Sequence, residues 1–343
     1  MIFKATLSLA TLLTNALLAT AAFPAPHTIT GDDQPGNWGG VHVHDPSIVL
    51  GPDGLYYSFS THPLVAVSSS PTIDGYWTRL GNALSKNSII NLAGNNDLWA
   101  PDVHKVGSTY YMYYSVSQFG SQNSAIGVAT STTLKPGSWT DHGAVIQSGS
   151  GAKAPLSTTN AIDGNLFIDP KTNNAYLTYG SFWGDIWQFR LNSGYTSVTT
   201  SPAPVQVSLD PAGTRPEEGS YLSYSSSTGY YYLWISHGQC CGFTAGSLPA
   251  AGAEYSIRVG RSSSPTGPFV DSAGKAMNSG GGDIILGSHN NIYAPGGQGV
   301  LSNVNGRDIL YYHYIDTNRG YSDGQKLMGY NYISYTNGWP SLS

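Results

Sequence analysis

The same order of segments recurs five times along the chain, and this repetition restricts the fold more than any other feature. Each unit opens with a strand-like run, passes through a short turn of Gly, Asn, Asp or Pro, and returns as a run rich in Tyr, Val and Ile. β-Branched and aromatic residues between such turns favour strands. The units succeed one another at a period of roughly 55 to 75 residues, which indicates a repeat architecture.

Five units of about four strands predict an all-β fold, a five-bladed β-propeller. The alternative is a β-sandwich with long loops. Four acidic residues favour the propeller, because each falls at the start of a unit's first strand and such positions line the central axis at one face. These residues are Asp45, Asp102, Asp163 and Glu218.

Few residues of this sequence are charged, and the net charge is slightly negative. Only 10% of the residues are charged and the formal net charge is -5, whereas about 25% are charged in an average soluble domain. The basic residues are scattered along the chain. Neither nucleic acid nor a membrane is therefore expected as a partner.

The first residues have the pattern of a secretory signal. Lys4 gives the positive start, an apolar run continues through Leu18, and Ala19-Thr20-Ala21 has the small residues of a cleavage site. A transmembrane helix is disfavoured because the run is short and interrupted. We expect a signal peptide over residues 1–21, a single propeller domain over residues 22–343, and a secreted, extracellular protein.

The two cysteines, Cys240 and Cys241, are adjacent. They cannot join distant parts of the chain, and their spacing does not suit a zinc site. A vicinal disulfide and a pair of buried thiols both remain open.

Acidic side chains that converge from different units suit the hydrolysis of a glycosidic bond. One carboxylic acid protonates the leaving oxygen while a carboxylate activates water, and a third acidic group raises the pKa of the acid. The chain has three glutamates, and two of them, Glu217 and Glu218, are adjacent. Consecutive strand residues face opposite ways, and the following Gly219-Ser220-Tyr221 favours Glu218 as the functional one. Any single Asp here could instead stabilise a turn.

Several motifs together make the sequence recognisable. They are His44-Asp45-Pro46-Ser47-Ile48, Trp99-Ala100-Pro101-Asp102, Ala161-Ile162-Asp163-Gly164 and Glu218-Gly219-Ser220-Tyr221-Leu222. In this order and spacing the chain resembles glycoside hydrolase family 43, and in particular its secreted fungal members that cleave arabinan. The resemblance spans essentially all of the chain after the signal.

The resemblance implies a five-bladed propeller and an inverting mechanism. By motif, Asp45 would be the general base, Glu218 the general acid, and Asp163 the residue that orients the acid and modulates its pKa. Asp102 would have a supporting role. The family often has Gly-Pro-Tyr after the acid, where this chain has Gly219-Ser220-Tyr221.

The resemblance also implies substrate and metal contacts. Trp99 and Phe119 match positions that contact arabinose units, and Asn160 and Ser181 are expected to bind sugar hydroxyls. His289 matches a histidine that holds one metal ion, usually calcium, in the central channel. Calcium prefers oxygen ligands, so such an ion would be largely coordinated by water. Packing roles are the alternative for Trp99, Phe119 and His289.

The implied activity is endo-hydrolysis of (1→5)-α-L-arabinofuranosidic linkages in arabinan, the polysaccharide of pectin side chains. We expect a monomer without an organic cofactor. An exo-acting α-L-arabinofuranosidase or β-xylosidase on the same fold is the nearest rival, although those relatives more often have Pro where this chain has His44. A retaining fructan-type hydrolase would need motifs that the chain lacks. A sugar-binding propeller without catalysis is the alternative from another class.

Overall fold

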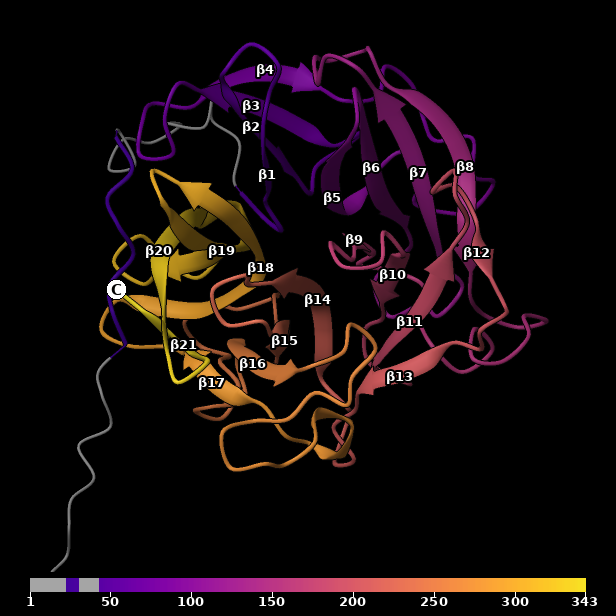
Figure 1. Ribbon diagram of the computed structural model, residues 1–343. Coiled ribbons are helices and arrows are strands. Elements are labelled where there is room, and N and C mark those ends of the chain that lie inside the picture. Colours follow the sequence, from indigo (N-terminus) through magenta and orange to yellow (C-terminus); the bar gives the residue numbers. More distant parts are fainter. Residues whose placement is uncertain (1–22, 31–42) are drawn as a thin grey trace, which may run out of the picture.

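The computed structural model describes residues 23–30 and 43–343, and over these ranges the chain forms twenty-one strands in five antiparallel sheets. The sheets stand as blades around one axis, which confirms the predicted five-bladed β-propeller (Figure 1). The predicted signal peptide lies outside the described residues. Within the described part of the chain, no helix has the length and apolar character needed to cross a bilayer.

Each of the first three blades is continuous in sequence. Blade 1 contains β1 (Ser47–Leu50), β2 (Tyr56–Ser60), β3 (Ala66–Ser70) and β4 (Thr78–Asn82). Blade 2 contains β5 (Trp99–Val106), β6 (Thr109–Val116), β7 (Ala125–Ser131) and β8 (Thr140–Gln147). Blade 3 contains β9 (Asn165–Ile168), β10 (Ala175–Tyr179), β11 (Ile186–Leu191), β12 (Val198–Thr199) and β13 (Val205–Ser208).

The last two blades follow the same plan. Blade 4 contains β14 (Glu217–Tyr224), β15 (Tyr231–His237), β16 (Ser256–Ser262) and β17 (Asp283–Leu286). Blade 5 contains β18 (Ile292–Val304), β19 (Arg307–Asp316), β20 (Lys326–Thr336) and β21 (Trp339–Leu342). Two short 3-10 helices, η1 (Met277–Ser279) and η2 (Asp323–Gln325), lie in connections.

Hydrophobic packing holds neighbouring blades together. Five clusters of buried side chains each join one blade to the next, and the last of them joins blade 5 to blade 1. The first joins Phe59 of β2 to Met112 of β6, for example. Since the strands of a blade carry large apolar residues on both faces, no blade can bury its surface alone.

The innermost strands β1, β5, β9, β14 and β18 contact each other in a ring around the axis. Side chains on these strands accept hydrogen bonds from the backbone of the next blade. Ser47 Oγ accepts from the N–H of Val103 at 2.9 Å, and Asp102 Oδ2 accepts from the N–H of Leu166 at 2.9 Å. Asp102 thus supports the junction between blades 2 and 3.

The residues that occupy corresponding positions in the five blades differ from those that the sequence pattern predicts. At a corresponding point in each blade, just before the innermost strand or at a bulge in it, a residue has a left-handed backbone with φ between 44° and 58°. These residues are Asp45, Ala100, Asp163, Gly219 and Gly297. Asp45 and Asp163 are therefore equivalent, whereas Asp102 lies two residues after the equivalent position and Glu218 one residue before it. The prediction that all four acids are equivalent is wrong, because in blades 2 and 4 Ala100 and Gly219 occupy the equivalent position.

The segment 23–30 connects the two blades at the seam of the ring. The N–H of His27 donates to the carbonyl of Tyr330 in blade 5 at 2.9 Å, and the N–H of Thr30 donates to the carbonyl of Asp74 in blade 1 at 2.8 Å. Ile29 is buried in the cluster between these blades.

Candidate active site

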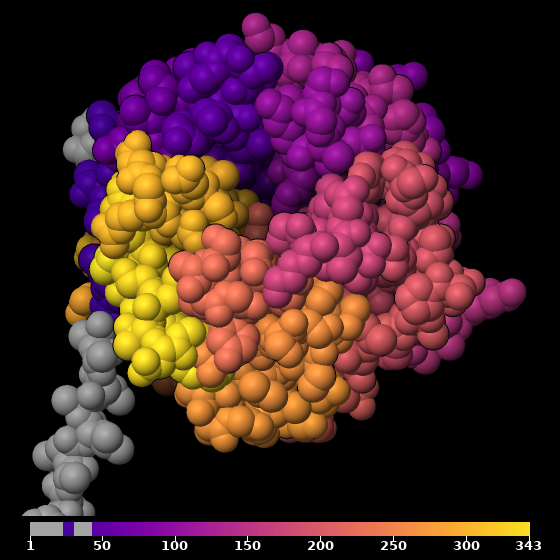
Figure 2. All heavy atoms as spheres, viewed as in Figure 1, coloured from indigo at the N-terminus to yellow at the C-terminus, as the bar shows by residue number. Residues whose placement is uncertain are grey.

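The innermost strands surround a small cavity at the axis. Five short segments, one from each blade, line it together with two tyrosines, and Figure 2 shows the molecule hollowed where the blades meet. The segments are 45–47, 100–102, 163–165, 219–221 and 297–298, and the tyrosines are Tyr255 and Tyr311. The volume of about 50 Å³ admits a few water molecules. Asp45 and Asp163, predicted as partners, do face the same space.

The Asp45 carboxylate is oriented by the hydroxyl of Thr61, which is itself fixed by a second hydrogen bond. Thr61 Oγ1 donates a hydrogen bond to Asp45 Oδ2 at 2.8 Å and accepts one from the N–H of Ala100 at 2.8 Å. The Asp45 side chain remains 23% exposed. This carboxylate is oriented and still accessible to water, as a general base must be.

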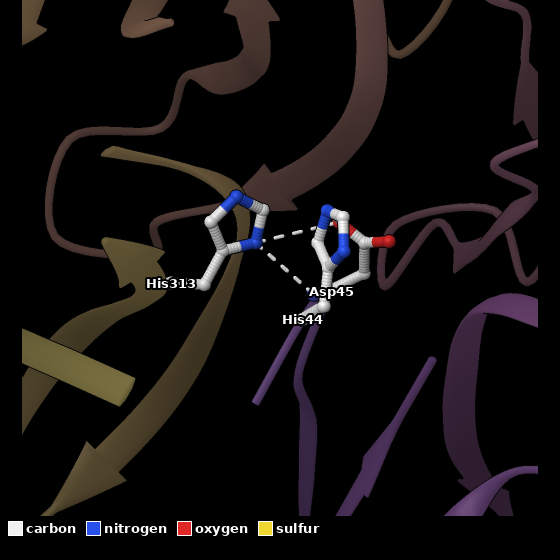
Figure 3. A group of neighbouring side chains, drawn as sticks. All are labelled: His44, Asp45 and His313. Atoms are coloured by element: carbon white, nitrogen blue, oxygen red, sulfur yellow. Dashed lines mark hydrogen bonds and ion pairs between the residues drawn. The ribbon is translucent and has the colours of Figure 1, made fainter. Parts of the chain in front are cut away.

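Two imidazoles, those of His44 and His313, border Asp45 (Figure 3). The N–H of Asp45 donates to His313 Nδ1 at 3.0 Å, so this ring nitrogen carries a lone pair. His44 Nε2 lies 3.0 Å from Lys326 Nζ. The two rings also lie 3.6 and 3.4 Å from Asp45 Oδ1. Both histidines therefore help to hold the position of this carboxylate.

Asp163 fixes the backbone that follows the proposed acid. Its Oδ2 accepts a hydrogen bond from the N–H of Gly219 at 3.0 Å, and its own N–H donates to Ser115 Oγ at 3.0 Å. Burial raises the pKa of Asp163 well above its usual range, and the negative charges of Glu218 and Asp45 raise it further. Asp163 is thus placed to orient Glu218.

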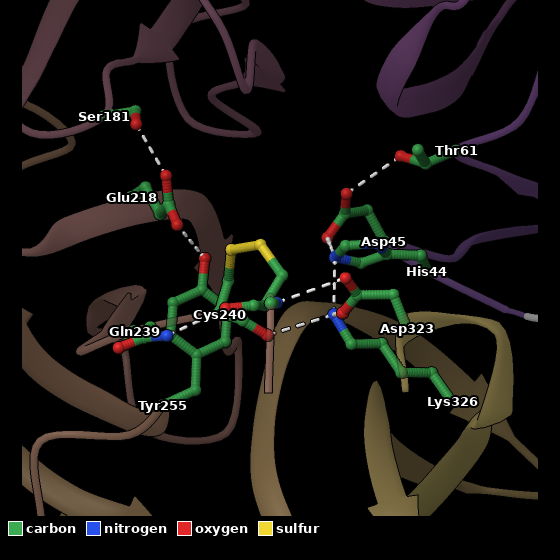
Figure 4. Close-up of a disulfide and its surroundings, with 12 residues drawn as sticks. His44, Asp45, Thr61, Ser181, Glu218, Gln239, Cys240, Tyr255, Asp323 and Lys326 are labelled. Carbon is green, nitrogen blue, oxygen red and sulfur yellow. Dashed lines mark hydrogen bonds and ion pairs between the residues drawn. A yellow bond between two sulfur atoms is a disulfide. The ribbon is translucent and has the colours of Figure 1, made fainter. Parts of the chain in front are cut away.

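Glu218 lies on the other side of the space from Asp45 (Figure 4). Ser181 Oγ donates to its Oε2 at 2.5 Å, and the Tyr255 hydroxyl donates to its Oε1. Burial raises the pKa of Glu218 and the charge of Asp45 adds to the effect, while the two hydrogen bonds and the Lys326 ammonium act in the opposite direction. The raised pKa values of Glu218 and Asp163 favour a proton on these buried carboxyl groups, and a general acid requires such a proton.

Glu217 faces the opposite side of β14, as the strand alternation predicts. It is fully buried, and burial raises its pKa to about 8, with Asp185 and Asp210 adding to the shift. Its neighbour in the sheet is His237, whereas Glu218 pairs with Ser236. Glu217 therefore belongs to a buried group between blades 3 and 4 rather than to the cavity.

The four residues predicted to contact sugar differ in their exposure and in their hydrogen-bond partners. Trp99 is half-buried, and its Nε1 donates to Asp97 Oδ2 at 3.4 Å. Phe119 is 86% exposed. Asn160 is buried, and its side-chain oxygen accepts no hydrogen bond within the described residues. Ser181 binds Glu218, a contact that the sequence did not suggest.

His289 does not border the cavity. It lies in the connection between β17 and β18, where its ring packs against Phe23 and its Nδ1 lies 2.8 Å from the carbonyl oxygen of Gly287. The histidine that reaches the carboxylates from β19 is His313, which sequence reasoning missed. Its position as a polar residue inside the apolar run Ile309–Ile315 was the available signal.

We expect Ser181→Ala to move the alkaline limb of the kcat/KM profile to higher pH, by about one unit. The hydroxyl stabilises ionised Glu218, so its loss raises the pKa of the acid, which then stays protonated at higher pH. A pH profile on arabinan measures the shift. Ser117→Ala, which removes a buried hydroxyl that bonds Ser124 instead, should leave the limb in place. A shift to lower pH would contradict the assignment.

We expect Thr61→Val to lower kcat by roughly tenfold, because Asp45 loses its orienting hydrogen bond while the volume is kept. We also expect a loss of stability of about 1–3 kcal/mol, because the N–H of Ala100 loses its acceptor. Steady-state kinetics and a thermal melt test this. An unchanged kcat would show that Thr61 does not orient Asp45.

Comparison with known proteins points in the same direction. The model of "Glycosyl hydrolases family 43" matches residues 40–340. The chain is 51% identical to "Probable arabinan endo-1,5-alpha-L-arabinosidase A" of Aspergillus flavus, over 89% of this chain and 92% of that protein. It is 47% identical to "Arabinan endo-1,5-alpha-L-arabinosidase A" of Aspergillus aculeatus, over 97% and 99%. The fold matches the Cellvibrio cellulosa alpha-L-arabinanase complexed with arabinohexaose, with a TM-score of 0.74, 27% identity, and coverage of 88% and 96%.

Proposed function

The chain belongs to glycosyl hydrolases family 43, and on this premise we propose that it hydrolyses internal (1→5)-α-L-arabinofuranosidic linkages of arabinan. One observation carries the proposal. An accessible carboxylate, Asp45, and a buried carboxyl group, Glu218, come from different blades, lie opposite each other in Figure 4 and interact electrostatically, in a chain about half identical to relatives named for this activity.

The proposed reaction is a single displacement. Asp45 takes a proton from a water molecule, whose oxygen forms a bond to the anomeric carbon. The bond from that carbon to the glycosidic oxygen breaks, and Glu218 gives its proton to the leaving oxygen. The anomeric configuration inverts. Asp163 holds the backbone after Glu218 through Gly219 and contributes to the raised pKa.

A calcium ion remains a proposal, and the residues present suit it poorly as direct ligands. Within the described part of the chain, the group that could hold a cation is His44, Asp45 and His313. Two imidazoles and one carboxylate are not the oxygen-rich set that calcium prefers. His44 Nε2 already accepts from the Lys326 ammonium. We derive no step through a metal ion, and we do not propose His289 as its ligand.

The polymer is proposed to cross the open end of the cavity. Phe119, with its exposed ring, and the half-buried Trp99 are placed to stack on arabinose units, and Asn160 has a buried amide oxygen to offer. Aromatic faces of this kind bury apolar sugar surface. We further propose that the protein is secreted as a monomer.

Product sizing on linear, debranched arabinan tests the proposal. Oligosaccharides of mixed length early in the reaction are the expected result. Release of arabinose alone would show an exo-acting enzyme. Binding of arabinan without cleavage would leave a sugar-binding propeller and overturn the mechanism.

A further inference from the structure

We propose that the Cys240–Cys241 disulfide is a positioning element for both proposed catalytic residues, so that turnover depends on its oxidised state. This inference rests on the proposed function and extends it to redox control of the same site. The structure contains the disulfide between these adjacent cysteines, which resolves the alternative that the sequence left open. The turn that contains the two cysteines follows β15, and in the view of Figure 4 the disulfide appears between the side chains of Glu218 and Asp45.

Lys326 connects the disulfide turn to Asp45, the proposed base. This ammonium is buried in the first residue of β20 and has three partners: the carbonyl oxygen of Cys240 at 3.0 Å, His44 Nε2 at 3.0 Å and Asp323 Oδ1 at 3.2 Å. The contacts with Cys240 and His44 have hydrogen-bond geometry, and the contact with Asp323 is an ion pair. The carbonyl of the disulfide turn therefore helps to set where Lys326 holds His44, the neighbour of Asp45.

Tyr255 connects the disulfide turn to Glu218, the proposed acid. The Cys240 side chain packs against a cluster that contains Tyr255, Phe243 and Ala294. The Tyr255 hydroxyl donates to Glu218 Oε1. Cys240 thus packs against the cluster that contains the acid's hydrogen-bond donor, and Figure 4 shows Tyr255 and Lys326 on opposite sides of this cysteine.

The turn also spans two blades. The N–H of Gly242 donates to Asp323 Oδ2 at 3.2 Å in η2 of blade 5, while the N–H of Gln239 donates to the carbonyl of Ala253 at 2.8 Å within blade 4. The bond between the two sulfur atoms fixes the short peptide between these anchors. Its loss frees the carbonyl of Cys240 to turn away from Lys326.

Both cysteines are half-buried rather than enclosed, so a small dithiol can reach them. In the reaction, dithiothreitol supplies two electrons and two protons, becomes a cyclic disulfide, and leaves two thiols at Cys240 and Cys241. Misplacing a catalytic group by about 1 Å can cost about 10²-fold. We expect reduction to lower kcat on arabinan by about 10- to 100-fold while KM changes by less than about threefold.

The experiment compares the intact enzyme before and after dithiothreitol, and again after reoxidation. Mass spectrometry of aliquots quenched with iodoacetamide measures the reduced fraction. The double variant Cys240→Ser/Cys241→Ser is the matched control, since it should have a low kcat that the reductant does not change. Lys326→Met should lower kcat without altering KM, and Lys326→Arg should restore part of it.

The outcomes separate the two proposals. Oxidised wild type that does not cleave arabinan would overturn the proposed function itself. An active enzyme whose kcat is unchanged after complete reduction would overturn only the positioning role. A fall in kcat that is matched by loss of the folded near-ultraviolet circular dichroism spectrum would show that the disulfide stabilises the fold instead.

Discussion

Glu218→Gln is expected to lower kcat/KM on arabinan by about 10²- to 10⁴-fold, the range for loss of a general acid. The amide keeps the size of the side chain, and its carbonyl oxygen can still accept from one of the two hydroxyls of Ser181 and Tyr255, but it has no acidic proton to give to the leaving oxygen. An aryl arabino-oligoside with a nitrophenolate leaving group should be cleaved far better by the variant than arabinan is, because that leaving group departs without protonation.

Glu217→Gln is the matched control, since it makes the same change one residue earlier in β14. Burial raises the pKa of Glu217 to about 8, which favours the protonated form at pH 7, and a neutral amide resembles that form. We expect kcat/KM within about threefold of wild type. Equal losses in the two variants would mean that the strand, and not the acid, was damaged.

Asp45→Asn is expected to lower kcat by about 10²- to 10⁴-fold on arabinan and on the activated aryl substrate alike. Water must be deprotonated whichever group leaves, so an easier departure cannot compensate for a missing base. The amide oxygen can still accept from Thr61, which keeps the local geometry. Kinetics on both substrates provide the test.

Asp53→Asn changes an acid in the β1–β2 turn of the same blade, where it bonds Tyr57, and should leave kcat intact. The stereochemistry gives an independent check. Proton NMR of early wild-type products should show the inverted, β-configured anomer. Activity on the aryl substrate that survives in Asp45→Asn, or an α-configured first product, would contradict the role of Asp45 as base.

The propeller, Asp45 and Asp163 could be predicted because they depend on features that repeat along the chain. Turn residues and apolar alternation mark each unit, and Asp45 and Asp163 occupy equivalent positions in the repeat. Strand alternation predicts that Glu217 and Glu218 face opposite ways, and their different environments agree with it. The choice of Glu218 depended on the Gly219-Ser220-Tyr221 that follows.

The rest could not be predicted because it depends on contacts between distant blades. Tyr255 and Lys326 reach the acids from residues that no local pattern connects to them. The predicted equivalence of Asp102 and Glu218 was wrong because the residue with the left-handed backbone, Ala100 or Gly219, is not acidic in their blades and the sequence pattern could not locate it to within one or two residues. The motif alone points to His289 as a metal ligand, although it is His313 that lies against Asp45.

The five sheets are each continuous in sequence, so within the described residues no strand is shared across the seam between blade 5 and blade 1. The eight residues 23–30 span that seam and act as a clasp, with hydrogen bonds to both sides. A shortened chain that begins after residue 30 would lose this clasp but keep every blade and every acid. The residue at which an expressed chain begins therefore affects the stability of the junction between blades 5 and 1, even though the shortened chain keeps every residue of the active site.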